Sequence, residues 1–207
     1  MNSVKDLILN PVQRFVAGVK LKRTKYGNTE NGFLACVDGN DLETFKLFLT
    51  AGVNINATDD IEETALIKAT RKEHVQILSM LLEQAELQVN KQALGGDTAL
   101  IAACRAGKRD AALLLLDDPR LNSNIKNDRG ETALMIACQQ DPTMVASLLV
   151  HLAITLNDQD RNGDTALMHA SRAGNVEAVQ LLLRKEGLEL DLCNEQGHSA
   201  LYLAIAG

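Results

Sequence analysis

The sequence predicts an all-α solenoid with short β-hairpin fingers, in which stacked units of about 34 residues share one core. The main observation is a repeated phrase, Thr-Ala-Leu followed by Ala three residues later. Its copies begin at Thr64, Thr98, Thr132, Thr165 and, in a Ser-Ala-Leu form, Ser199. Consecutive copies are 34, 34, 33 and 34 residues apart. A fixed period of this length is the signature of a repeat array rather than of a globular domain.

The composition agrees with thin helical layers. Of the 207 residues, 46% are hydrophobic, only 3% are aromatic, and Trp is absent. The core must therefore consist of Leu, Ala, Ile and Val, which suits closely packed helices. No run of about 18 apolar residues occurs, so we expect no membrane span.

The charge is distributed unevenly along the chain. The net charge is −6, but residues 1–26 hold six basic residues and one acidic residue, or +5, which leaves −11 for the remainder. A strongly acidic array argues against nucleic-acid binding, because that function needs a basic face.

Residues 1–28 are predicted to form an amphipathic, basic helical cap. Ser3 and Asp6 have the spacing of a capping box, and Asn10-Pro11 can begin a second helix. That helix carries apolar residues at helical spacing: Val12, Phe15, Val16 and Val19. We expect this face to cover the open end of the first unit. The alternative is a weak contact of residues 1–25 with anionic lipid, or with an acidic partner.

Residues 29–207 are predicted to form the array. The first unit is degenerate, with helices around Phe33–Cys36 and Leu42–Leu49 and a C-cap at Gly52. The second, third and fifth units pair helices over residues 64–72 and 75–83, 100–106 and 111–116, and 167–173 and 176–184. In the fourth unit, Asp141-Pro142 begins the second helix with a side-chain cap and a permitted Pro. The last unit holds a single helix before Gly207, and we expect the natural chain to continue beyond it.

The segments between units carry turn signals. Asn or Asp recurs six residues before the turn glycine, at Asn56, Asn90, Asn124, Asn157 and Asp191, and predicts local side-chain hydrogen bonds. Gly130, Gly163 and Gly197 supply the left-handed conformation that a tight turn requires. Glu62 replaces this glycine in the second unit, so we expect that finger to be distorted.

These features together resemble the ankyrin repeat. The period, the hairpin turn, Gly-x-Thr-x-Leu-x-x-Ala and a Leu-rich second helix all match, and they imply about five full repeats plus a terminal half repeat. Two departures exist. Ala replaces the usual Pro after Thr, at Ala65, Ala99, Ala133, Ala166 and Ala200. An apolar residue or Tyr replaces the usual His after Leu, so the hydrogen bonds of that His should be missing.

Little in the sequence suggests catalysis. The four His residues lie in different units and slots, and none has a Cys or Ser at nucleophile–base spacing. Cys36, Cys104 and Cys138 share one slot, where neighbouring layers should lie about 8–10 Å apart, farther than a disulfide allows. We therefore expect buried thiols in a reducing compartment, no metal or cofactor, and no enzyme activity.

The resemblance places partner binding on the concave surface. The pairs that end the first helices include Arg71-Lys72, Arg105-Ala106, Gln139-Gln140 and Arg172-Ala173, and the fingers opposite are rich in acid. Either each Arg pairs with a finger carboxylate, or the Arg row receives a ligand. The candidate partner-binding residues are Arg71, Lys72, Arg105, Gln139, Gln140, Arg172, Asp128, Arg129, Asp160 and Arg161.

The predicted function is a non-enzymatic, monomeric adaptor or scaffold that binds an acidic or extended polar protein segment. We expect it in the cytoplasm, or in the cytosol of a host cell if the chain is a delivered bacterial or viral effector. One alternative is a regulator tethered to a membrane or an enzyme through the basic N-terminal helix. Another is a targeting module for a catalytic region beyond residue 207.

Overall fold

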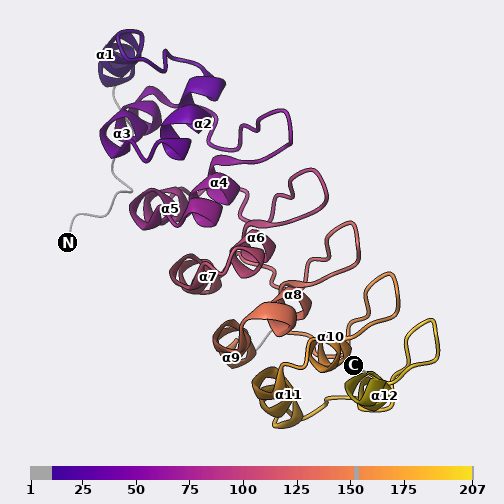
Figure 1. The fold of residues 1–207 in the computed structure, drawn as a ribbon. Helices are drawn as coiled ribbons and strands as arrows, with labels where there is room; N and C mark the ends of the chain where they lie inside the picture. Colours follow the sequence, from indigo (N-terminus) through magenta and orange to yellow (C-terminus); the bar gives the residue numbers. More distant parts are fainter. Residues whose placement is uncertain (1–10, 152–153, 207) are drawn as a thin grey trace.

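A computed structural model describes residues 11–151 and 154–206 and shows a solenoid of short helices (Figure 1). The short helix expected after Ser3, with Val4, Leu7 and Ile8, lies outside the described residues. Within them the helices are α1 (Pro11–Leu21), α2 (Glu30–Asp38), α3 (Leu42–Ala51), α4 (Ala65–Lys72), α5 (Val75–Leu82), α6 (Ala99–Arg105), α7 (Arg109–Leu116), α8 (Ala133–Gln140), α9 (Pro142–Val150), α10 (Ala166–Arg172), α11 (Val176–Leu183) and α12 (Ala200–Ala206).

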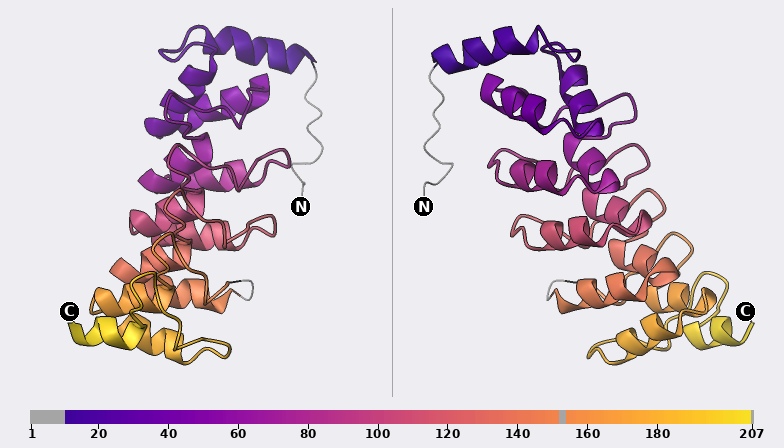
Figure 2. Two further views of the ribbon diagram at one scale, coloured as in Figure 1. Left: turned by 90° about the vertical axis from the view of Figure 1, so that its right-hand side faces the viewer. Right: turned by 60° about the vertical axis from the view of Figure 1, so that its left-hand side comes forward.

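The helices form two layers, and loop fingers project beside the inner one (Figures 1 and 2). The inner layer runs α2, α4, α6, α8, α10 and α12, each in contact with the next, and the outer layer runs α3, α5, α7, α9 and α11. In the described residues the fingers contain two isolated antiparallel bridges, Thr58 with Thr64 and Cys193 with Ser199, instead of extended strands. None of the helices in the described residues has the length and hydropathy that a membrane span requires.

The repeated Thr fixes where the inner helices begin. Thr64, Thr98, Thr132 and Thr165 are buried N-caps, and each hydroxyl accepts a hydrogen bond from the backbone N–H three residues later. An N-cap of this kind satisfies a donor that the helix itself leaves unpaired. The Ala and Leu that follow are buried in these four units, whereas Leu201 of the last unit is exposed, so one phrase specifies both the helix start and its packing face within the array.

The core is continuous from the first helix pair to the last. Small residues of the inner helices, such as Ala69, Ala103 and Ala137, are fully buried and let adjacent layers approach closely. Cys36, Cys104 and Cys138 are buried free thiols, as expected. Burial raises the pKa of the Cys36 and Cys138 thiols to about 12, which makes both unreactive.

Adjacent fingers are joined by a backbone ladder. Leu94 N donates to Ile61 O, and the same bond recurs in the later fingers, from Asp128 N, Arg161 N and Glu195 N. Glu62 has φ of 59°, in the same left-handed region as Gly130 at 77°. The turn bonds on each side of Glu62 are present, so the expected distortion of this finger is wrong.

The recurring Asn residues do more than turn the chain locally. The Asn56 side chain donates to Glu86 O at 2.9 Å and accepts from Gln88 N at 2.8 Å, and Asn90 and Asn157 bind the following unit in the same way. The local turn bonds come instead from Asp59, Asn127, Asp160 and Asn194, whose Oδ1 atoms each accept two backbone N–H groups. The Asn column therefore joins units.

Helix α1 packs with a different face from the one expected. It lies against α3 and buries Ala17 and Leu21. Its stripe of Val12, Phe15, Val16 and Val19 is exposed, with Phe15 73% accessible. The face that carries Ala17 and Leu21 is the one that packs into the array, and tertiary packing selects that face over the more apolar stripe.

Candidate functional site

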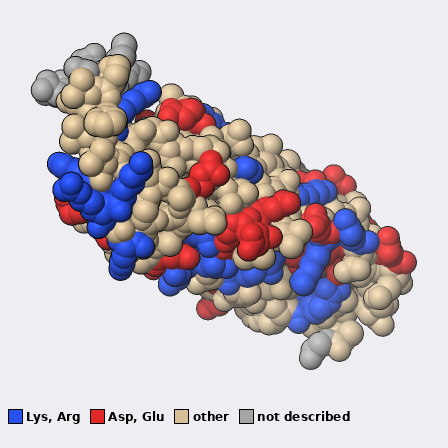
Figure 3. Space-filling model, turned by 90° about the horizontal axis from the view of Figure 1, so that it is seen from above, with Lys and Arg blue, Asp and Glu red and all other residues tan. Residues whose placement is uncertain are grey.

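The concave groove is the surface between the fingers and the inner helices α4, α6, α8 and α10. A carboxylate stands directly before each capping Thr, at Glu63, Asp97, Glu131 and Asp164. An Arg stands seven residues after that Thr, at Arg71, Arg105 and Arg172, with Gln139 in the fourth unit. Basic and acidic side chains consequently lie next to one another over the surface seen in Figure 3.

Three arginines pair with the carboxylate of their own unit. Arg71 Nη1 lies 2.6 Å from Glu63 Oε1, and Arg172 Nη1 lies 2.6 Å from Asp164 Oδ2. Arg105 binds Asp97 with two nitrogens, at 2.9 and 3.1 Å. The hydrogen bond to Asp97 is the main reason that the Arg105 pKa is raised. These pairs brace each finger against its helix while roughly half of each Arg side chain stays accessible.

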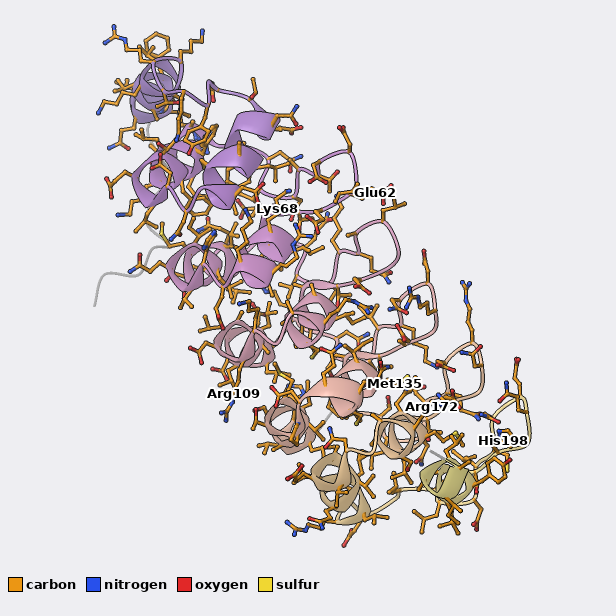
Figure 4. The ribbon with its side chains drawn as sticks, in the orientation of Figure 1. Glu62, Lys68, Arg109, Met135, Arg172 and His198 are labelled. Atoms are coloured by element: carbon orange, nitrogen blue, oxygen red, sulfur yellow. The ribbon has the colours of Figure 1, made fainter. Side chains whose placement is uncertain are left out.

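Lys68 is a buried cation that the sequence interpretation missed. From α4 it points toward the first finger (Figure 4), and its Nζ lies 2.6 Å from Asp59 Oδ2 and 3.5 Å from both Asp38 Oδ2 and Glu63 Oε2. Burial alone would lower the Lys68 pKa, but the hydrogen bond and the surrounding carboxylates raise it above its usual value. Burial opposes ionisation of Asp59, yet bonds from Lys68 and the backbone lower the Asp59 pKa.

His169 occupies the slot of Lys68 in the fifth unit, four residues after the capping Thr, and was also missed. Its Nε2 lies 3.0 Å from Asp160 Oδ2, and its Nδ1 lies 3.1 Å from Gln139 Nε2. The column of this slot reads Lys68, Ala102, Ile136, His169 and Leu203. Aligning that column would have marked Lys68 and His169 as polar groups in a position that is otherwise apolar.

The remaining candidate residues fall into two groups. Lys72 Nζ lies 3.2 Å from Asp38 Oδ1, Gln140 is exposed at the end of α8, and Asp128, Arg129 and Arg161 are exposed at the finger tips. Asp160 differs, because its side chain is only 3% accessible and bonds inward to His169 and to the backbone of its own turn. Asp160 is therefore a positioning residue and not part of the exposed surface.

An apolar hollow of about 200 Å³ opens between the first two fingers. It exists because Ala102 is the smallest residue in its column. Ile61 and Leu94 line it from the finger side and are 48% and 68% accessible. Arg71 and Arg105 stand at its edge. The sequence interpretation did not single out this hollow. Alignment of the units does show an apolar Leu94 in the finger and a small Ala102 in a column of larger residues.

Asp160, Asp164 and His169 offer three potential metal ligands within 4.8 Å of one another. However, these oxygen and nitrogen atoms already form hydrogen bonds and ion pairs within the chain. Asp164 Oδ1 accepts from Asn194 at 2.8 Å, and Asp164 Oδ2 binds Arg172. A guanidinium bound to one ligand repels a cation, and the described donors fit a hydrogen-bond network better than a metal site.

Comparison with known proteins agrees with this architecture. The family description "Ankyrin repeats (3 copies)" matches residues 33–127, 86–160 and 134–207. Human NAD-capped RNA hydrolase NUDT12 (Homo sapiens) is 38% identical over 65 residues, 31% of this chain, and its Macaca fascicularis counterpart gives the same values. The alignment spans only 14% of the hydrolase.

A solved structure resembles the chain along most of its length. A chain in the complex of the predatory endopeptidase Bd0816 from Bdellovibrio bacteriovorus with immunity protein Bd3460 superposes with a TM-score of 0.72 and 26% identity. The match covers 84% of this chain and 90% of that chain. Family description, stacked helix pairs and repeated Thr caps agree, and this chain belongs to the ankyrin-repeat family.

Proposed function

We propose that the chain is a non-catalytic adaptor whose concave groove holds a segment of another protein. Ankyrin repeats typically bind proteins and carry no catalytic machinery of their own. The observation that carries the proposal is the apolar hollow at Ala102, where Ile61 and Leu94 are held open to water beside two arginines. Apolar surface exposed in a concavity gains about 25 cal/mol per Å² when a ligand covers it.

The groove favours an extended polar segment that carries one apolar side chain. The apolar group would fill the hollow, while backbone carbonyls or carboxylates of the segment would accept from the accessible parts of Arg71 and Arg105. The stack preforms this surface, so the chain loses little conformational entropy on binding. Lys72, Gln140, Arg129 and Arg161 would add polar contacts at the edges.

The experiment compares matched substitutions inside and outside the groove. Leu94→Asp alters the hollow, and Leu113→Asp makes the same change on exposed α7 of the outer layer. Each full-length variant is immobilised, and captured proteins are quantified by mass spectrometry after circular dichroism shows equal folding. We expect a specific partner of the native chain to be retained by Leu113→Asp and lost by Leu94→Asp. Equal capture by both variants would reject the groove as the binding surface.

The arginine row is tested separately. Arg71→Glu/Arg105→Glu/Arg172→Glu reverses the three guanidinium charges and should abolish capture of the same partner. Because each Arg also braces a finger, this variant requires its own check of folding. A folded triple variant that still captures the partner would remove the Arg row from the binding surface.

A narrower form of the proposal takes the partner to be an enzyme that the groove neutralises. It is supported by the structural similarity to a chain from an endopeptidase–immunity protein complex. The captured partner would be purified and assayed with and without an equimolar amount of this chain. Inhibition by the native chain but not by Leu94→Asp supports neutralisation, and unchanged partner activity contradicts it.

A second candidate function is contact of α1 with an anionic membrane. It is favoured by the exposed apolar stripe of α1 and by the excess of basic residues over residues 1–26. An apolar face flanked by Lys and Arg is typical of interfacial helices. Full-length chain and Phe15→Asp/Val16→Asp would be sedimented with phosphatidylcholine vesicles, with and without phosphatidylserine. Binding that needs phosphatidylserine and is lost in the variant supports this function, and absence of sedimentation rejects it.

A further inference from the structure

The fourth unit lacks the arginine that the neighbouring units use to neutralise their finger carboxylate. Gln139 stands where Arg71, Arg105 and Arg172 stand in the other units. Glu131 is nevertheless present in the carboxylate position. The fourth unit therefore contains the carboxylate but not the arginine that pairs with it in the other units.

Glu131 is only partly satisfied by the rest of the chain. The residue is 8% accessible. Its Oε2 accepts from Asn127 Nδ2 at 3.0 Å and lies 3.6 Å from Arg105 Nη2, which the closer Asp97 already holds. Among the described residues, no donor forms a hydrogen bond to Oε1. Oε1 is not among the fully buried polar atoms, so water satisfies it, and a cation of a ligand can replace that water.

Gln139 is turned away from Glu131 and adds a second acceptor. Asp160 accepts from His169 Nε2, which leaves His169 Nδ1 to accept from the Gln139 amide nitrogen. The Gln139 amide oxygen then has no hydrogen-bond donor among the described residues. One unit thus presents two acceptor oxygens that only solvent satisfies, one of them on a charged group.

Both oxygens belong to residues that line the same hollow. It has a volume of about 370 Å³ and is lined by Glu131, Gln139, His169, Arg172 and Ala173. Ala173, at the end of α10, leaves room that a longer side chain would fill. Arg172, whose position Figure 4 marks on α10, is held by Asp164 at 2.6 Å and is thereby kept from Glu131. The hollow is open to solvent and accommodates an extended side chain.

We propose that this hollow receives a basic side chain, Arg or Lys, from the protein bound in the concave groove. That side chain takes the place of the arginine missing from the fourth unit and donates to Glu131 Oε1 and the Gln139 amide oxygen. A guanidinium suits the site best, because its planar fork of donors can reach two acceptors at once. The inference rests on the proposed function and adds the chemistry of one position in the ligand.

Gln139→Arg supplies the missing arginine within the chain and should close the hollow. The substitution is compatible with the fold, since three other units carry Arg in this slot. Glu131→Gln removes the negative charge and keeps the side-chain size. Matched controls make the same changes on the exposed outer helix α11, as Gln180→Arg and Glu177→Gln.

The probe is a phage-displayed library of random dodecapeptides, selected on immobilised native full-length chain. Selected peptides are then measured on all variants. We expect them to be enriched in Arg or Lys, and to bind Gln139→Arg and Glu131→Gln about tenfold or more weakly. Binding to the two controls should be unchanged. Replacing the basic residue of a peptide with norleucine should cause the same loss on the native chain and none on Gln139→Arg.

The outcomes separate this inference from the proposed function. Peptides that lose binding to Leu94→Asp but bind Gln139→Arg normally, or that carry no basic residue, would overturn the inference and leave groove binding intact. Peptides that bind Leu94→Asp and Gln139→Arg as well as they bind the native chain would overturn both. Failure of any peptide to enrich on the native chain would also count against both.

Discussion

The two halves of the concave groove carry equivalent carboxylate positions but differ in the cations that pair with them. In the first half, Lys68 Nζ lies 2.6 Å from Asp59 Oδ2 and Arg71 Nη1 lies 2.6 Å from Glu63 Oε1, so both carboxylates have a close cation. In the second half, Gln139 replaces Arg, His169 replaces Lys, and Glu131 is shared with the preceding unit at 3.6 Å. Asp59 and Glu63 are thus neutralised closely within their own unit, whereas Glu131 has a more distant cation from another unit.

The difference shows how a repeat protein can acquire specificity without changing its fold. Each slot recurs at nearly the same place in every layer, so a single substitution changes the surface and leaves the core intact. Ala102 in place of a larger residue opens an apolar hollow, and Gln139 in place of Arg exposes a polar one. Complementarity to one partner can arise from such departures from the repeat.

Removing the buried cation should have the largest effect on the first half of the groove. Lys68→Met removes a buried cation and leaves the partly accessible Asp59 without its closest partner, which should cost up to about 3 kcal/mol of unfolding free energy. Lys72→Met, at an accessible position, should cost less than about 1 kcal/mol. Urea denaturation of both variants measures the contrast. Similar midpoints would show that Lys68 is not the centre of this network.

Acid should weaken both halves, and this is the next largest effect because several carboxylates contribute together. The pKa values of Asp59 and Asp164 are lowered, since bonds from Lys68 and Arg172 outweigh burial. Their stabilisation is complete above the unfolded pKa of about 4 and is lost as pH falls through the lower folded values. Urea midpoints should therefore drop below about pH 4. Lys68→Met should flatten this drop, and an unchanged slope would contradict the assignment.

Replacing Arg105 of the third unit with Gln, the residue of the fourth unit, should lower the unfolding free energy by a smaller amount. Arg105→Gln removes the two bonds to Asp97 and the nearby charge beside Glu131, and should cost about 1 kcal/mol because the pair is partly exposed. Thermal unfolding at low and high salt gives the comparison, since the loss should shrink as salt screens the native pair. A loss that does not depend on salt would point to packing by the Arg stem instead.

The smallest effect concerns the turn of the first finger. Glu62 holds φ of 59° without the freedom of glycine, so Glu62→Gly should raise stability by about 0.5 kcal/mol. Gly130→Ala tests the opposite case, because its added Cβ would lie 2.8 Å from Arg161 N and must destabilise the stack. Thermal denaturation distinguishes the two. A destabilising Glu62→Gly would mean that the Glu side chain contributes a contact of its own.

The period, the pairing of helices and the start of each inner helix follow from the amino-acid sequence alone. These depend on local chemistry: a Thr hydroxyl caps the N–H three residues ahead, and apolar residues at helical spacing define the buried face. The Arg row and its acidic fingers were visible for the same reason. Their pairing within one unit was the first of the two alternatives that the pattern left open, and the structure shows these pairs.

The contacts between units depend on tertiary packing and could not be predicted from local sequence patterns. Lys68 meets Asp38 of the preceding unit, Glu131 lies near Arg105, and the Asn56 column bonds forward into the next unit. Helix α1 packs against α3 with the face that carries Ala17 and Leu21 and leaves its more apolar stripe exposed. These choices depend on distances between layers, and a one-dimensional pattern fixes which residues recur but not which neighbour each side chain reaches.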